Sequence, residues 1–143
     1  MKGGPTKTAL AVIPEEECWE LLRSQDVGRI AVRLGDSLHI FPINYLVTDH
    51  SIVFRTDSGT MLAAVHTADP VAFEIDQIDA GLASGWSVVV EGRAEEILDT
   101  VEIGRLEATA LRPWAPGRKA HFVRVTARSV SGRRIVEVVP TVT

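Results

Sequence analysis

The chain has 143 residues, which suits one domain large enough to bury a substantial core. Apolar residues make up 45% of the sequence, which excludes a largely disordered chain, and a formal net charge of −4 argues against a general nucleic-acid binder. Because no apolar run approaches the ~18 residues of a membrane span and no secretory signal is recognisable, we expect a soluble cytoplasmic protein.

The N-terminal part is expected to contain a leader and one helix. Residues 1–9 show no regular pattern and predict a flexible leader, followed by a single domain over residues 10–143. Pro14 and the three glutamates after it are typical of a helix start, because proline presets a helical φ and negative charge suits the N-terminal end of the helix dipole. The only cysteine, Cys18, falls on the apolar face of this helix.

Strands dominate the rest of the chain. Alternating or β-branched runs predict them at residues 27–34, 38–47, 51–56, 70–76, 86–97, 121–127 and 131–139. Two more helices are predicted, one from Thr60 to about residue 66 and one over about residues 100–109, capped by Asp99. Six or seven mostly antiparallel strands with two or three flanking helices predict a mainly β fold, a small barrel rather than a parallel sheet.

The stretch over residues 53–62 is the most informative in the chain. A strand ends with Arg55 and Thr56, a small polar turn follows at residues 57–59, and a helix opens at Thr60. Such a turn gathers backbone N–H groups, a hydroxyl group and a guanidinium group around one point, which suits a phosphate. Many strand-to-helix turns of this kind bind nothing, so the residues alone leave a phosphate site and a plain turn both open.

Common catalytic and metal-binding motifs are missing from the sequence. The four histidines are scattered without metal-ligand spacing, so no metal is expected, and each is interpreted as a surface or strand-flanking residue. The sequence has no nucleophile elbow and no nucleotide-binding P-loop, and no pair of carboxylates stands out as acid and base. If the protein performs chemistry, a bound cofactor is the expected reactive agent, and the catalytic residues stay unknown.

Five segments form a further pattern when they are taken in order. They are VGRIA at 27–31, FPINY at 41–45, FRT with GT at 54–60, VAFEID at 71–76 and GWSVVV with GRA at 85–94. In order and spacing they resemble the pyridoxamine 5′-phosphate oxidase-like proteins, the FMN-binding split β-barrel family, and its short actinobacterial-type members in particular. The resemblance extends over residues 12–136. It implies a homodimer of split barrels with flavin mononucleotide (FMN), or a related deazaflavin, in a groove between subunits.

The resemblance also implies a set of cofactor-binding residues. Those around the phosphate would be Arg55, Thr56, Ser58, Gly59 and Thr60. Along the isoalloxazine ring or ribityl chain would lie Asn44 and Tyr45, and the site would be closed by Trp86 and Ser87. The planar faces of Tyr45 and Trp86 suit a flavin ring, but a buried core aromatic is an equal alternative for both.

One position departs from the family pattern. The family commonly has a lysine two residues after the turn glycine, where this chain has Met61. Losing that ammonium group removes a charge-assisted hydrogen bond worth roughly 1.5–3 kcal/mol. With Met61 at this position, the cofactor could be FMN, a deazaflavin or haem, or the protein could have no cofactor. Arg55 remains the one cation expected at the phosphate.

The function that the resemblance implies is a flavin- or deazaflavin-dependent oxidoreductase acting on a small molecule, in which the cofactor transfers hydride. The alternative is a non-catalytic flavin- or haem-binding protein or sensor on the same barrel, with or without a cofactor. In either case we expect a homodimer, with neither nucleic acid nor a membrane as partner. Candidates for burial between the subunits are Ile40, Val88, Val90 and Val123, since the few helices leave apolar strand faces uncovered.

Overall fold

The computed structural model describes residues 7–109, 111, 113–114, 117 and 119–138, and in this part of the chain it has eight strands and three helices. The strands are β1 (Thr8–Ile13), β2 (Val27–Leu34), β3 (Ser37–Asn44), β4 (Leu46–Thr48), β5 (Ser51–Thr56), β6 (Pro70–Asp79), β7 (Ser84–Glu96) and β8 (His121–Glu137). The helices are α1 (Glu15–Ser24), α2 (Thr60–Val65) and α3 (Thr100–Glu107).

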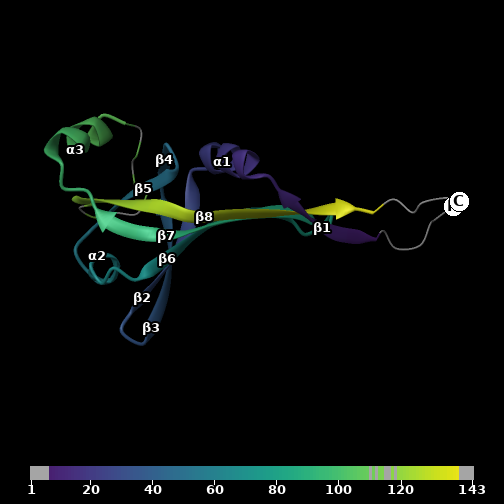
Figure 1. Ribbon diagram of the computed structural model, residues 1–143, viewed down its shortest axis with the longest axis horizontal. Helices are drawn as coiled ribbons and strands as arrows, with labels where there is room; N and C mark the ends of the chain where they lie inside the picture. The colour runs from purple at the N-terminus through teal and green to yellow at the C-terminus, as the bar shows by residue number, and fades with distance from the viewer. Residues whose placement is uncertain (1–6, 110, 112, 115–116, 118, 139–143) are drawn as a thin grey trace, which may run out of the picture.

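The strands form one antiparallel sheet in the order β3-β2-β6-β7-β8-β5-β4, and β1 pairs with β8 outside this path. Strand β8 therefore has three partners: β7, β5 and β1. The sheet curls into a half-barrel, with α1 and α3 on one side and α2 on the other (Figure 1). The mainly β split barrel with flanking helices, predicted from the sequence, is confirmed.

Two apolar clusters stabilise this sheet. The larger one is the main core, and its fully buried members include Leu22, Ile30, Ile52, Phe54, Phe73, Ile75, Val88, Val90, Val123 and Val125. The smaller one lies against α3 and contains Val53, Ile97, Leu106, Leu111 and Phe122. Burying each large apolar side chain contributes roughly 1.5–3 kcal/mol, so these clusters are the main source of stability.

Three of the four residues expected at a subunit interface belong to the main core instead. Val88, Val90 and Val123 are fully buried within the single chain, because alternate residues of a strand face the same side and theirs is the core side. The fourth, Ile40 on β3, has 68% of its surface exposed. The expectation for the three valines was therefore wrong.

The strand boundaries differ from the prediction in three places. β1 begins at Thr8, inside the expected leader, and residues 1–6 of that leader lie outside the described residues. The strand predicted over residues 38–47 is interrupted at Tyr45, which separates β3 from β4. β8 is continuous where two strands were predicted, because a bulge at Arg128, opposite the Glu91–Gly92 step of β7, absorbs one extra residue.

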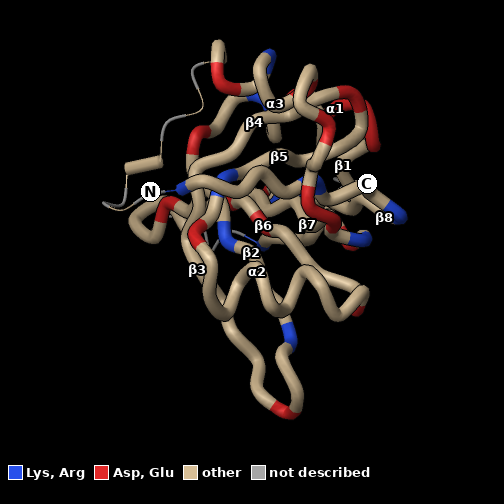
Figure 2. The backbone as a smooth tube through the Cα atoms, turned by 90° about the vertical axis from the view of Figure 1, so that its left-hand side faces the viewer, with Lys and Arg blue, Asp and Glu red and all other residues tan. Residues whose placement is uncertain are grey.

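The helices begin at the residues that the sequence indicates. Pro14 directly precedes α1, whose first turn is acidic, and Figure 2 shows acidic residues gathered along this helix. Asp99 caps α3, since its Oδ1 accepts hydrogen bonds from the backbone N–H groups of Val101 at 2.9 Å and Glu102 at 3.2 Å. Among the described residues, none of the helices has the length and hydrophobicity that a membrane span requires.

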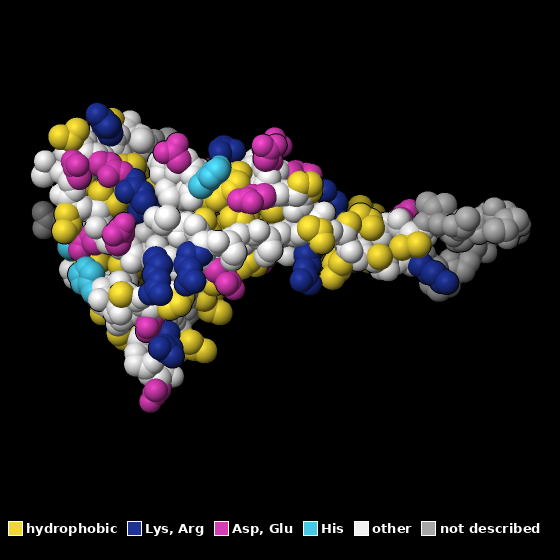
Figure 3. Space-filling view, in the orientation of Figure 1, with side chains coloured by type: hydrophobic (Ala, Val, Ile, Leu, Met, Phe, Trp, Pro, Cys, Tyr) yellow, Lys and Arg dark blue, Asp and Glu magenta, His cyan; other side chains and the backbone are white. Residues whose placement is uncertain are grey.

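One end of the sheet projects beyond the core as an arm, formed by residues 8–13, 76–86 and 132–137 (Figure 1). The pairing of β1 with β8 continues past the strand ends, because Val138 N–H donates to the Lys7 carbonyl at 2.9 Å. Figure 3 shows hydrophobic side chains on the surface of the arm. The exposed large apolar residues in its segments and in the turn that joins them include Leu10, Val12, Ile78 and Leu82. Such a gathering of apolar surface is typical of a protein contact.

Two carboxylates lie side by side on β6, on the face opposite the core. The guanidinium of Arg29 on β2 is 3.9 Å from Glu74 Oε1 and 3.6 Å from Asp76 Oδ2. Glu74 Oε1 is buried and accepts no hydrogen bond from the described residues. Burial, together with the hydrogen bond and charge of Asp76, raises the pKa of Glu74 to about 7, and Arg29 opposes this rise only in part.

Glu74→Gln is expected to stabilise the protein at pH 8 and to leave its stability nearly unchanged at pH 4. The pKa of Glu74 is higher in the folded chain than in the unfolded one. Its contribution to the free energy of unfolding is therefore fully present below the ordinary pKa of 4.5 and is lost as the pH rises through about 7. Urea unfolding at both pH values measures this, with the exposed Glu91→Gln as control. An equal effect of Glu74→Gln at both pH values would contradict the raised pKa.

Candidate functional site

A groove of about 540 Å³ lies between the β2–β3 hairpin, the turn from β5 to α2 and the segment before β8. It brings together seven of the residues expected at a cofactor, namely Asn44, Arg55, Thr56, Ser58, Gly59, Thr60 and Met61. The turn depends on Gly59, whose φ of 142° is a conformation that side chains with a Cβ atom rarely adopt.

Arg55 stands at the end of β5 with its guanidinium fixed by two contacts. Its Nε–H donates to the carbonyl oxygen of Lys119 at 2.9 Å, and its guanidinium carbon lies 4.6 Å from the centre of the Phe122 ring. A planar guanidinium stacks well on an aromatic face, which restricts its orientation. These contacts hold a cation at the wall of the groove.

Lys119 is a second cation at the groove, and the sequence analysis missed it. Its Nζ is 3.4 Å from Asp57 Oδ2, and its side chain is only 23% exposed. Lys119 is 64 residues from Arg55 in the sequence. It lies at the groove because β8 pairs with β5, and this pairing sets Arg55 opposite Phe122, three residues after Lys119. The signal that could have found it is a lysine directly before a strand that must pair with residues 51–56.

The remaining walls of the groove are largely apolar. Val27, Phe41 and Ile43 supply them from the β2–β3 hairpin. Met61 also lines the groove but is only 8% exposed and belongs to the main core. Met61, at the position where the resemblance implied a lysine, is therefore a packing residue, and lysine at this position would bury its stem in the core.

Tyr45 is expected beside a cofactor, but the structure places its side chain in the core. It is 6% exposed, its hydroxyl donates to the Leu22 carbonyl at 2.5 Å, and its ring meets Phe73 edge-on with centroids 4.7 Å apart. Burial raises the pKa of Tyr45, with a smaller contribution from Asp26. This environment matches the alternative of a buried core aromatic.

Trp86 and Ser87 do not line the groove in the single chain. They pair with Arg134 and Arg133 of β8, at the base of the arm. Trp86 instead borders a separate hollow of about 310 Å³ together with Gln77 and Arg134. Any contact of Trp86 with a ligand in the groove would therefore have to come from another copy of the chain.

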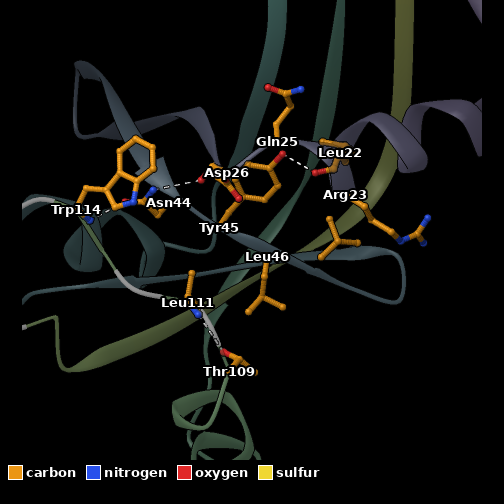
Figure 4. A pocket seen from close by; sticks show the side chains of 11 residues that line it. Leu22, Arg23, Gln25, Asp26, Asn44, Tyr45, Leu46, Thr109, Leu111 and Trp114 are labelled. Carbon is orange, nitrogen blue, oxygen red and sulfur yellow. Dashed lines mark hydrogen bonds between the residues drawn. The ribbon is translucent and has the colours of Figure 1, made fainter.

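A second cavity, of about 570 Å³, adjoins the groove and is shown in Figure 4. Asn44 and Trp114 line both spaces. The backbone N–H of Trp114 donates to Asn44 Oδ1 at 2.7 Å, and Asn44 Nδ2 donates to the Asp26 carbonyl at 3.3 Å. The Trp114 segment is thus fastened through its backbone, while 72% of the residue stays exposed.

Two of the histidines that looked scattered in the sequence converge on one carboxylate. His121 Nδ1 is 2.8 Å from Glu96 Oε2, and His66 Nε2 is 3.0 Å from Glu96 Oε1. On its other side, His121 Nε2 is 3.3 Å from Ser58 Oγ in the groove. Within the described residues, no group of three His, Cys, Asp or Glu side chains is arranged to hold a metal ion.

Comparisons with known proteins agree with this architecture. The family model described as pyridoxamine 5′-phosphate oxidase matches residues 14–140. An uncharacterized protein of Mycobacterium tuberculosis is 33% identical over 129 residues, which cover 87% of this chain and 84% of the relative.

Two of the similar solved structures resemble the chain in fold and are also about one-third identical to it in sequence. The FAD binding protein of Mycobacterium smegmatis has a TM-score of 0.71 at 34% identity, covering 86% of this chain and 96% of that one. A conserved protein of unknown function from Corynebacterium diphtheriae has a TM-score of 0.74 at 33% identity, covering 89% of this chain and 98% of that one.

Proposed function

The chain belongs to the pyridoxamine 5′-phosphate oxidase family, and we propose that it binds a phosphate-bearing flavin, FMN, in the groove and acts as an oxidoreductase on a small molecule. The observation that carries the proposal is that Arg55 and Lys119 meet at one groove with apolar walls. A phosphate needs cations and polar donors, and an isoalloxazine ring needs apolar surroundings. The similar protein of M. smegmatis, which binds FAD, supports a flavin in general.

Each part of the groove has a role in this proposal. Arg55 and Lys119 hold the phosphate as cations, and the hydroxyl groups of Ser58 and Thr60 add donors. Phe41 and Ile43 exclude water from the ring portion. A bound flavin supplies hydride transfer, and the protein supplies binding, orientation and exclusion of water.

A titration tests the proposed function directly. Purified protein is titrated with FMN, FAD, riboflavin, a deazaflavin and haem, and binding is followed by absorbance and fluorescence. We expect FMN to bind more tightly than riboflavin, because only FMN carries the phosphate. A Soret band without flavin binding would favour the haem-binding alternative, and a bound flavin that no small-molecule donor reduces would favour a non-catalytic protein. Binding of none of these would contradict the proposal.

We also propose that two copies form a homodimer that covers the arm and the exposed face of β3. The single-layered arm carries exposed apolar side chains, and Ile40 is exposed on the hairpin that also lines the groove. A second copy on this face would enclose the groove and bury Ile40. Because Trp86 and Ser87 lie at the base of the arm, the second copy is also the one means by which they would approach a flavin.

Light scattering is expected to give a particle of twice the 15.6 kDa chain mass at micromolar concentration. Ile40→Glu should shift this particle toward the monomer and weaken FMN binding, because it places a charge on a buried contact. Leu98→Glu is the matched control, since Leu98 is as exposed but lies between β7 and α3. A stable wild-type monomer would rule out both the dimer and a flavin enclosed between subunits.

A further inference from the structure

Ser58, which lines the groove, ends a chain of polar side chains that leads away from it. Its Oγ is 3.3 Å from His121 Nε2, and His121 Nδ1 is 2.8 Å from Glu96 Oε2. The other carboxylate oxygen of Glu96 is 3.0 Å from His66 Nε2. The pairing of β5 with β8 creates this arrangement, because it sets His121 opposite Thr56, two residues before Ser58.

The carboxylate of Glu96 determines which nitrogen of His121 carries a proton. Hydrogen bonds from His121 and, to a smaller extent, from His66 lower the pKa of Glu96, although burial partly opposes them. An ionised carboxylate can only accept hydrogen bonds, so His121 Nδ1 must donate to it. In the neutral imidazole His121 Nε2 is then an acceptor, and the hydrogen bond to Ser58 requires the hydroxyl of Ser58 to donate.

We propose that His121, oriented by Glu96, is a positioning residue that sets the direction of the Ser58 hydroxyl and makes the affinity of the groove for a phosphate depend on pH. While His121 is neutral, the Ser58 hydroxyl donates a hydrogen bond to His121 Nε2, and its oxygen lone pairs face the groove. When His121 is protonated, His121 Nε2–H donates to Ser58 Oγ, and the hydroxyl proton can turn to the phosphate. The inference rests on the proposed function in placing a phosphate in the groove.

The other titratable groups near His121 come from β7, the end of α2, the turn after β5 and the segment before β8. Glu96 ends β7, and His66, at the end of α2, bonds the same carboxylate rather than Ser58. In the turn beside Ser58, Asp57 is paired with Lys119. Of these side chains, the two imidazoles change from a neutral to a cationic form when they gain one proton. Only His121 reaches Ser58, so its protonation is the one that reverses the hydroxyl.

The direction of the effect follows from linkage. Because a phosphate binds the form with protonated His121 more tightly, its binding takes up a proton, and its affinity rises as the pH falls. A gained charge-assisted hydrogen bond corresponds to roughly tenfold tighter FMN binding at pH 6 than at pH 8. Riboflavin lacks the phosphate and should bind equally at both pH values.

The test compares FMN and riboflavin binding at pH 6 and pH 8 in wild type, His121→Gln, Ser58→Ala and His50→Gln. The phosphate of FMN itself gains a proton near pH ~6, so the variants are compared with wild type at each pH. His50 is the matched control, because it stacks on Trp19 with ring centroids 5.1 Å apart and does not line the groove. We expect the ratio of FMN affinity at pH 6 to that at pH 8 to be the same in His50→Gln as in wild type, and to be roughly tenfold lower in His121→Gln and Ser58→Ala.

Two other outcomes would overturn the inference while leaving the proposed function intact. If both His121→Gln and Ser58→Ala keep the wild-type pH effect, neither residue positions the phosphate. If only His121→Gln loses it, the imidazole charge acts on the phosphate directly, and Ser58 is not the link. A wild type that binds no FMN at either pH overturns the proposed function and this pH dependence together.

A measurement without ligand tests the positioning itself. Side-chain nitrogen NMR of the free protein at pH 8 should show neutral His121 protonated at Nδ1, because Glu96 accepts from that atom. In Glu96→Gln the amide can also donate, so the preference for this tautomer should weaken. Protonation of wild-type His121 at Nε2 would overturn the inference whatever the flavin titrations show.

Discussion

Arg55→Ala is expected to weaken FMN binding by roughly 30- to 150-fold, which corresponds to about 2–3 kcal/mol for losing hydrogen bonds to a charged group. Arg55 brings a planar cation to the groove in an orientation set by Phe122 and the Lys119 carbonyl. Lys119 remains in the variant, so binding should persist at reduced affinity. Riboflavin should bind almost as it does to wild type, since it has no phosphate for Arg55 to contact.

Two controls separate the loss of a phosphate contact from damage to the fold. Arg33→Ala removes an exposed arginine on β2 that is paired with Asp69 at 3.3 Å, and it should leave FMN binding unchanged. Thermal unfolding of Arg55→Ala checks that loss of the Phe122 contact leaves the protein folded. If Arg55→Ala weakens riboflavin as much as FMN, Arg55 does not bind the phosphate.

Gly92→Ala is expected to lower the free energy of unfolding by about 3 kcal/mol, near the upper end for overpacking. A Cβ at Gly92 would overlap the carbonyl oxygen of Thr126 and lie 2.9 Å from its carbonyl carbon. Both atoms are backbone, so no side-chain rotation can relieve the overlap. The site is the bulge between β7 and β8, and the substitution must separate these strands or shift their register.

Urea unfolding at one fixed protein concentration measures this change, because assembly would make stability depend on concentration. Gly104→Ala in α3 is the control, since apart from the neighbouring residues and the backbone of α3 itself, no heavy atom of the described residues lies within 4 Å of a Cβ added there. Alanine favours a helix interior over glycine, so Gly104→Ala should stabilise the protein by roughly 0.5–1 kcal/mol. A Gly92→Ala protein within about 0.5 kcal/mol of wild type would mean that the bulge can open at little cost.

Local sequence signals were sufficient for most elements of this fold. Pro14 and Asp99 indicate helix starts through backbone geometry and capping, which involve only neighbouring residues. The continuity of β8 was not predictable in the same way. Its irregular middle suggested two strands, and only the long-range pairing with β7 shows that a bulge at Arg128 accommodates the extra residue.

The candidate site was predictable only in part, for the same physical reason. The turn from Arg55 to Met61 is contiguous, so the sequence could bring these residues together. Lys119 reaches the groove, and His121 reaches Ser58 beside it, through the pairing of β5 with β8, which no local pattern specifies. For Tyr45, planarity and polarity suit a cofactor and a core equally, and only the folded chain, through its burial and its hydrogen bond to Leu22, distinguishes them.

The three partners of β8 have a consequence for how the protein is made. On the ribosome, β8 emerges after every other described strand, so one edge of β5 and one edge of β7 stay unpaired until β8 has been synthesised. β1 emerges first and pairs only with β8, which sets Thr8 opposite Glu137 and closes a loop that spans almost the whole described chain. Unpaired edges favour aggregation, so the nascent chain is most vulnerable in the interval before β8 is complete.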